Sequence, residues 1–187
     1  MNFKDFLSTR KSAIKKKWFN SIIDDYPADA SDFLRKQKDR FLNPVGNTLD
    51  ENIDGLLDEI FIDADSERVY PYLNDIIKIK AVQNFSPSKA VSFIYLLKRV
   101  VREELESDIE KNKFTDEFKS FESQLDNLAL LAFDIYMKCR EQIFDLRVNE
   151  IKTLTFRLLK QADLVREVEE HEAYSGDKTV ITQNIKG

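Results

Sequence analysis

The residues that could carry chemistry in this sequence are few, and they begin with a single histidine. His171 stands among Glu167, Glu169, Glu170 and Glu172, which is the composition of a weak Glu/His metal site. The sequence has no second histidine, and the same run is typical of a solvated helix end that leads into a tail. A nucleophile activated by His171 would also have to reach it from a distant part of the chain. We therefore expect neither a metal site nor a catalytic base here.

The other reactive groups also have simpler structural interpretations. Cys139 is the only cysteine, so no internal disulfide can form, and its place on an apolar helical stripe is typical of a buried thiol that packs as a small hydrophobe. A redox sensor would need an exposed thiolate of low pKa. Adjacent carboxylates such as Asp24 and Asp25 point in different directions on a helix, and four scattered glycines cannot form a phosphate-binding loop. We predict that the chain is not an enzyme and binds no cofactor.

Composition and charge narrow the class of protein further. The 187 residues are 42% hydrophobic and 34% charged, with a net charge of −5 that disfavours general nucleic-acid binding. No apolar run approaches the roughly 18 residues of a membrane span, and Asp5 with the lysines from Lys11 to Lys17 interrupts any signal peptide. We read that basic segment as the outer face of a core helix rather than as a membrane-surface helix. The expected location is the cytoplasm.

The elements that must position these residues are helices. Only four glycines and four prolines are present, which argues against an all-β fold. Periodicity predicts six helices: Phe3–Asp25, one capped by Ser31 that runs through Phe41, one capped by Thr48, one from Asp65 or Ser66 to about Ile79, one from Ser86 to about Ile109, and one of roughly 50 residues from Thr115. We expect one all-α domain over residues 1–168 and a polar, flexible tail over 169–187.

The fifth and sixth predicted helices carry the clearest patterns. Ser86 and Pro87 form an N-cap and first-turn proline, and the residues behind them are apolar around most of the helix, as in a buried central helix. In the sixth helix a heptad stripe predicts a seam against a partner helix, which we assign to a homodimer: Phe118, Phe121, Leu125, Leu128, Ala132, Ile135 and Cys139. Beyond Cys139 the apolar residues drift to another face, as expected if that part of the helix meets a second subunit.

The region from Asp75 to Glu103 resembles a known family. Its segments Ile77–Gln83, Phe85–Val91 and Leu96–Lys98 are similar to the signature of the RsbRD N-terminal family, the sensor domains of RsbR-type stressosome proteins. The residues that carry the motif are Lys78, Lys80, Gln83, Phe85, Ser86, Pro87, Lys98, Arg102 and Glu103. Trp18, Tyr26-Pro27 and the segment Asp39–Gly46 also follow the order and spacing of the family.

The resemblance implies a globin-like domain of six to eight helices that is dimeric, binds no haem and serves bacterial signal transduction. In that family a STAS domain usually follows, whereas here only a short polar segment does, so we expect output through binding to a protein partner that the sequence does not identify. An alternative is a carrier of a small apolar ligand, in a pocket walled by Phe61, Ile76, Ile79, Phe93 and Leu97. Another is an accessory subunit of a larger complex, which docks through the basic face around Lys78 and Lys98 onto an acidic or a membrane-bound partner.

Overall fold

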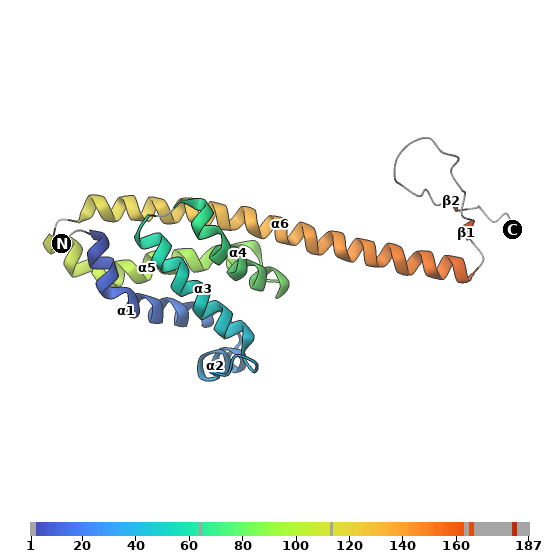
Figure 1. Cartoon of the computed structure of the whole chain (residues 1–187), viewed down its shortest axis with the longest axis horizontal. Coiled ribbons are helices and arrows are strands. Elements are labelled where there is room, and N and C mark those ends of the chain that lie inside the picture. Colours follow the sequence, from blue (N-terminus) through green and yellow to red (C-terminus); the bar gives the residue numbers. More distant parts are fainter. Residues whose placement is uncertain (1–2, 64, 113, 163–164, 167–180, 183–187) are drawn as a thin grey trace. The chain divides into compact units, whose positions relative to one another are not determined.

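The computed structural model describes residues 3–63, 65–112, 114–162, 165–166 and 181–182, and within them the protein is all-α apart from two very short strands. Six helices follow one another: α1 (Phe3–Ile23), α2 (Ala28–Lys36), α3 (Pro44–Phe61), α4 (Ser66–Val82), α5 (Pro87–Asn112) and α6 (Thr115–Gln161). Strands β1 (Val165–Arg166) and β2 (Ile181–Thr182) pair antiparallel. The predicted all-α class and the long last helix are confirmed (Figure 1).

The chain divides into two compact units, residues 1–140 and residues 141–187. Helix α6 supplies residues to both units. None of the described helices combines the length and the hydropathy that crossing a membrane requires. The predicted tail, 169–187, and His171 lie outside the described residues except for Ile181 and Thr182.

The starts of α2 and α3 differ from the predicted ones. Helix α2 begins three residues before Ser31, whose hydroxyl donates to the Ala28 carbonyl oxygen at 2.9 Å inside the helix instead of capping it. Helix α3 begins four residues before Thr48, because the Asn43 side chain accepts from the Gly46 N–H at 2.9 Å and Pro44 is tolerated at N1. The prediction overlooked asparagine as a cap. Asp65 does cap α4, as one of the two predicted choices, by accepting from the Arg68 N–H at 3.1 Å.

Helix α2 also ends earlier than predicted, at Lys36, so Phe41 lies in a turn and not in the helix. The Asp39 carboxylate accepts the N–H groups of Phe41 and Leu42 at 2.8 and 3.1 Å, and the Asn43 side chain donates to the Leu34 and Gln37 carbonyl oxygens. These bonds offer the backbone an alternative to helix. The turn leaves Phe41 almost entirely exposed.

The core of the first unit lies between α1, α3, α4, α5 and the first part of α6. Helix α1 packs on both α3 and α5, and α3 packs on α4. Helix α5 is the buried central helix that its apolar sequence predicted, with Phe93, Ile94, Leu97 and Val101 fully enclosed. Trp18 of α1 is enclosed as well, and its indole ring stacks on Phe93 with the ring centroids 6.0 Å apart.

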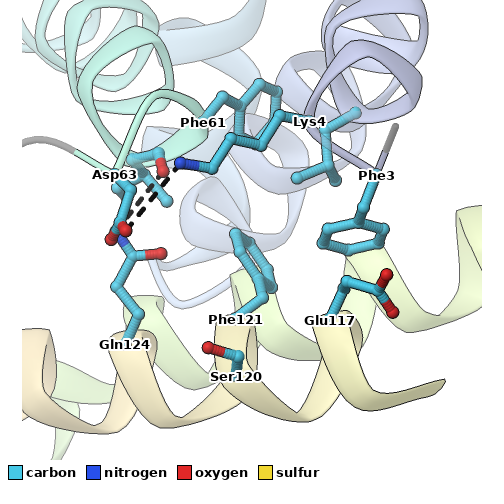
Figure 2. A pocket seen from close by; sticks show the side chains of 10 residues that line it. Phe3, Lys4, Phe61, Asp63, Glu117, Ser120, Phe121 and Gln124 are labelled. Atoms are coloured by element: carbon cyan, nitrogen blue, oxygen red, sulfur yellow. Dashed lines mark hydrogen bonds and ion pairs between the residues drawn. The ribbon is translucent and has the colours of Figure 1, made fainter. Parts of the chain in front are cut away.

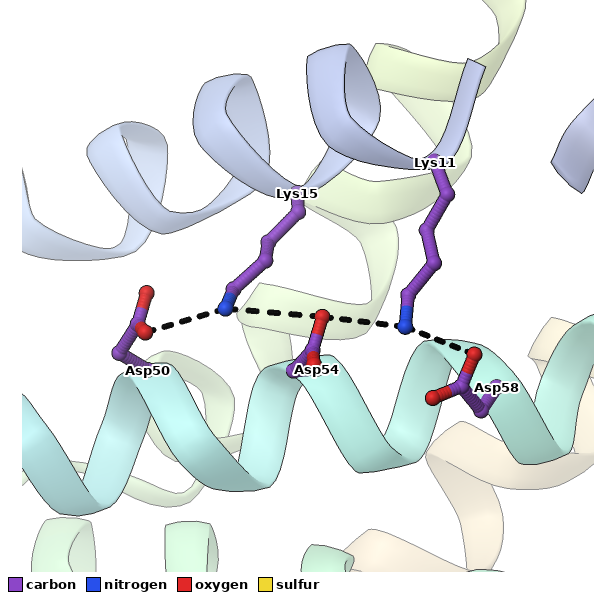
Figure 3. Close-up of polar contacts among 5 residues, drawn as sticks. All are labelled: Lys11, Lys15, Asp50, Asp54 and Asp58. Atoms are coloured by element: carbon purple, nitrogen blue, oxygen red, sulfur yellow. Dashed lines mark hydrogen bonds and ion pairs between the residues drawn. The ribbon is translucent and has the colours of Figure 1, made fainter. Parts of the chain in front are cut away.

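Ion pairs neutralise most of the basic face of α1. Lys11 and Lys15 reach across to the acidic face of α3 and alternate with Asp50, Asp54 and Asp58 along the two helices, as Figure 3 shows. The Nζ–carboxylate distances run from 2.7 to 3.5 Å. Lys17 pairs with Glu104 of α5. The contacts agree with the interpretation of α1 as a core helix with a charged outer face.

Candidate functional site: the turn between α4 and α5 and an aromatic pocket beside α6

The family-like motif lies on a turn with an unusual backbone. Helix α4 ends in a Schellman arrangement, in which the Phe85 N–H donates to the Lys80 carbonyl oxygen at 3.1 Å and the Asn84 N–H donates to the Ala81 carbonyl oxygen at 3.2 Å. Asn84 adopts a φ of 60°, in the left-handed region where asparagine is among the better tolerated residues after glycine. The motif therefore encodes a helix stop followed directly by the Ser86-Pro87 start of α5.

Lys80 is buried beneath this turn. Its side chain has no exposed surface, and its ammonium has no hydrogen-bond partner among the described residues. The Nζ atom lies 4.7 Å from the ring centroid of Phe85 and 5.9 Å from that of Phe93, so aromatic faces take the place of water. Burial lowers the pKa of Lys80 to about 8, although the charge of Asp25 acts in the opposite direction. A cation that is costly to bury thus sits at the centre of the motif.

Helix α1 and its C-terminal end hold one side of the turn. The Tyr26 hydroxyl donates to the Gln83 side-chain oxygen at 2.8 Å, and the Tyr26 ring meets the Phe85 ring edge-on at 5.3 Å. Burial, with a contribution from Asp25, raises the pKa of Tyr26 to about 12. Behind the turn, Trp18 Nε1 donates to the Phe93 carbonyl oxygen at 2.6 Å.

Helix α6 holds the other side. The Tyr136 hydroxyl donates to the Phe85 carbonyl oxygen at 2.5 Å. One turn later, Arg140 Nη1 donates to the Ala81 carbonyl oxygen at 3.2 Å and to Asn84 Oδ1 at 2.9 Å. The turn is therefore a joint at which α1, α4, α5 and α6 meet through named hydrogen bonds.

The remaining motif residues connect α5 to its surroundings. Ser86 Oγ accepts from the Lys89 N–H at 3.4 Å, which fits its predicted role as N-cap, and Pro87 is the first residue of α5. Lys98 and Arg102 pair with Asp126 and Glu122 of α6. Glu103 pairs with Arg99 along α5, and Lys78 is exposed. Of the basic face proposed for docking, Lys98 is thus already neutralised by the chain itself.

The predicted dimer seam on α6 lies inside the single chain. All seven of its residues, Phe118, Phe121, Leu125, Leu128, Ala132, Ile135 and Cys139, are at most 7% exposed. Arg102 also lies over the Phe118 ring at 5.2 Å. The heptad spacing is accounted for by packing on the chain's own helices, so contacts with a second copy would have to use other residues of α6.

Such residues are present in the second unit, where α6 turns from buried to exposed. Phe144, Ile151, Leu154 and Leu158 are between 51% and 66% exposed. Their spacing of 7, 3 and 4 places them at heptad positions, and in the sequence the same spacing extends back through Leu130, Phe133 and Met137, which are also exposed. The drift of the apolar stripe after Cys139 therefore ends in a face that stays exposed among the described residues.

A pocket of about 330 Å³ opens in the first unit where α1, the end of α3 and α6 meet. Figure 2 shows aromatic rings from all three elements around it, Phe3, Phe61 and Phe121, with the polar side chains of α6 along one side. The lining residues are Phe3, Lys4, Leu7, Ile60, Phe61, Asp63, Glu117, Ser120, Phe121 and Gln124. A second hollow of about 350 Å³ shares Ile60, Asp63, Ser120 and Gln124 with it, so the two adjoin along α6.

Of the five residues predicted to wall an apolar pocket, Phe61 alone lines this one. Ile76, Phe93 and Leu97 are fully enclosed and Ile79 is half-buried, and none of these four lines either hollow. The prediction placed the pocket in the centre of the helix packing, where side chains leave no open space. The observed pocket lies at the helix ends.

The potential metal ligands and Cys139 are the remaining groups that could take part in chemistry. No group of three or more His, Cys, Asp or Glu side chains is arranged to hold a metal ion in the part of the chain that the structure describes. Cys139 is buried, and burial raises the pKa of its thiol, which opposes formation of a reactive thiolate.

Sequence reasoning missed the side chains that join α6 to the turn. Tyr136 and Arg140 stand beside the heptad residues Ile135 and Cys139, and their polar ends gave no sign of a distant partner. The pocket residues Phe3, Glu117 and Ser120 were missed for the same reason, since α1 and α6, which supply them, are far apart in sequence. A weak signal was available in Lys80, a lysine placed among Ile76, Ile77, Ile79 and Ala81.

Comparisons with known proteins support the family resemblance of the motif. An uncharacterised protein of Archaeoglobus fulgidus is 30% identical to this chain over 93 residues, which span 49% of this chain and 52% of that protein, so the match covers about half of the relative's length. No solved structure matches, and the globin-like arrangement therefore stays a prediction. The family described as the RsbT co-antagonist protein rsbRD N-terminal domain matches residues 12–151, which include α2 to α5, most of α1 and α6 through Ile151, and the chain belongs to that family.

Proposed function

We propose that this protein is a non-enzymatic sensory or regulatory domain of the cytoplasm that acts through protein contacts. The family described above supports a sensory role of the stressosome type. The observation that supports the proposal most strongly is the contact between α6 and the motif turn, where Tyr136 and Arg140 donate hydrogen bonds to backbone carbonyl oxygens. A change in the packing of the first unit would reach α6 through these bonds.

The output surface in this proposal is the exposed face of α6 beyond Arg140. Its apolar residues Phe144, Ile151, Leu154 and Leu158 are large and their exposure is costly, since each side chain would gain roughly 1.5–3 kcal/mol on full burial. A second copy of the chain is the proposed occupant, because a heptad stripe is complementary to another heptad stripe. The contact replaces the buried seam that the sequence suggested.

In this proposal, signalling through such a contact would switch the helices between two packing arrangements. Packed helices tend to move between discrete arrangements rather than deform continuously. The turn over Lys80 is suited to take part, because its central cation is buried without a hydrogen-bond partner among the described residues. An event that reorganises the turn would change the constraint on α6 at Arg140.

The test is the oligomeric state of two matched variants. Leu154→Asp places a charge in the exposed stripe, and Asn149→Asp adds the same charge to an exposed position off the stripe. Analytical ultracentrifugation should show the wild type and Asn149→Asp as dimers at micromolar concentration and Leu154→Asp as a monomer. A wild type that stays monomeric at 100 µM, a concentration of roughly the order at which weak specific contacts form, would overturn the dimer.

A second candidate function is a carrier of a small ligand, and the pocket in Figure 2 favours it. The two candidates differ in what binding does. In a carrier the ligand leaves the association of α6 unchanged, whereas in a sensor it shifts the dimer dissociation constant. Ultracentrifugation with and without a bound ligand separates them.

A further inference from the structure

The pocket between α1, α3 and α6 has walls of a distinct chemistry. The Phe121 ring centroid lies 6.0 Å from that of Phe3 and 6.5 Å from that of Phe61, with the ring planes inclined at 70° and 54°. Inclined rings around an open space present both faces and edges to an occupant. Ring faces carry partial negative charge and attract cations.

The polar groups on the wall also favour a positive ligand. Glu117 and Asp63 contribute two carboxylates, and Lys4 is the only cationic side chain in the lining. Lys4 is already engaged, since its Nζ donates to the Ile62 carbonyl oxygen at 3.3 Å and lies 3.8 Å from Asp63 Oδ2. No hydrogen bond or ion pair joins the Glu117 carboxylate to another described residue, and Figure 2 shows this carboxylate on the α6 side of the pocket.

The shape of the pocket is set by structural features that do not depend on a ligand. Asp63 lies at the C′ position of α3 with a φ of 59°, and its N–H donates to the Ile60 carbonyl oxygen at 3.1 Å. Gln124 Nε2 donates to the same carbonyl oxygen at 3.3 Å and joins α6 to the end of α3. A volume of about 330 Å³ is at the lower end of the range for small-molecule sites.

We propose that this pocket binds a small organic ammonium ion, with its apolar body among Phe3, Phe61 and Phe121 and its charge at Glu117. Aromatic rings together with an unpaired carboxylate recognise such cations and repel the matching carboxylic acids. This inference names a ligand class for the proposed sensory function and rests on that function for its purpose. Because four of the lining residues belong to α6, an occupant would contact the same helix that the motif turn holds.

The probe is 2-phenylethylammonium, compared with the neutral 2-phenylethanol and the anionic 3-phenylpropionate. Titration calorimetry of the full chain should rank the ammonium ion about tenfold above the alcohol, which an exposed charge–charge contact and a cation–π contact provide together, and show no binding of the acid. Glu117→Gln should reduce the advantage over the alcohol to the few-fold that the aromatic rings alone provide. Glu106→Gln, an exposed control on α5, should keep the full advantage. Phe121→Leu should weaken both ligands, with circular dichroism to check that the variant is folded.

Three results would overturn the inference: no binding of the ammonium ion at millimolar concentration, equal binding of all three probes, or a Glu117→Gln variant that retains the full preference. The dimer measurement keeps this separate from the proposed function. Loss of ammonium binding in a wild type that still dimerises overturns the ligand class alone. Ammonium binding that leaves the dimer dissociation constant unchanged supports the site and contradicts the sensory function.

Discussion

The two parts of α6 carry similar apolar residues in very different surroundings. Up to Cys139 the heptad residues are buried within the single chain, whereas from Phe144 onward the apolar residues are mostly exposed. The difference does not come from helix propensity, because the helix is continuous from Thr115 to Gln161. It shows that one pattern of spacing can occur on a buried face and on an exposed face of the same helix, and that only the neighbours decide which.

The largest expected effect is a difference in unfolding free energy between variants in the buried part and in the exposed part of α6. Leu125→Ala removes a fully buried side chain and should lower the free energy of unfolding by about 2–5 kcal/mol. Leu154→Ala should change it by less than about 0.5 kcal/mol at protein concentrations below the dimer dissociation constant. Urea unfolding followed by circular dichroism measures both. Equal losses for the two variants would contradict the division of the helix.

A second prediction concerns Lys80, whose ammonium group is buried in the first unit. The folded pKa of Lys80 is about 8 and its ordinary value is 10.5, so between these values the unfolded chain binds more protons and the free energy of unfolding rises with pH. The expected rise from pH 7.5 to 9.5 is about 2 kcal/mol. Tyr26, with a pKa raised to about 12, acts in the opposite direction only above about pH 10.

Lys80→Met is the control for this pH dependence. It keeps most of the length of the side chain and removes the charge, so the rise between pH 7.5 and 9.5 should disappear while stability at pH 7 is maintained or increased. Lys78→Met, at an exposed position two residues earlier, should leave the rise intact. A wild-type protein whose stability is flat over this range would contradict the buried, low-pKa state of Lys80.

A third prediction concerns Arg140, which lies at the boundary between the buried and the exposed part of α6. Arg140→Met removes two hydrogen bonds between α6 and the motif turn and should cost about 1–3 kcal/mol in unfolding free energy. Amide hydrogen exchange should increase at Asn84 and Phe85, whose turn loses its anchor. Arg147→Met, on the exposed part of the same helix, should leave exchange in the turn unchanged.

The smallest expected effect concerns the surface ion pairs. Lys11→Met should lower the unfolding free energy by at most about 1 kcal/mol, because the pair with Asp58 is partly exposed and screened by salt. The pairing with Asp58 and Asp54 raises the pKa of Lys11 against a partial loss of solvation, in agreement with a favourable but weak contact. Unfolding at low and high salt measures the effect, and a loss above about 2 kcal/mol would show that the pairs matter as much as hydrogen bonds to buried groups.

Much of the fold was predictable because it depends on local patterns. The start of α5 at Ser86-Pro87, the cap at Asp65 and the great length of α6 follow from cap chemistry and from the lack of glycine or proline between Thr115 and Gln161. The starts of α2 and α3 were wrong, because serine and threonine were favoured over the proline and asparagine at the true boundaries.

The site was much less predictable. Lys80, Gln83, Phe85 and Ser86 were identified through family resemblance, yet the contacts of this turn depend on distant parts of the chain: Trp18, Tyr26, Tyr136 and Arg140. The pocket was placed among Ile76, Phe93 and Leu97, where close packing leaves no space. Hydrophobicity distinguishes buried from exposed residues, but it does not locate the gaps between helices.

The sequence by itself determined the helical class, the motif turn and its family, because helix starts, stops and apolar stripes depend on residues within a few positions of one another. The tertiary structure decided the rest: that the first heptad stripe is an internal core, that the second is exposed, that Lys80 is enclosed by aromatic rings, and that a pocket opens beside α6. Most of these depend on side chains separated by 50 or more residues in the chain or on the absence of a neighbour, and the contacts of Lys80 with Phe85 and Phe93 depend on how α4, the turn and α5 fold against one another. Such relations arise only when the helices pack in space.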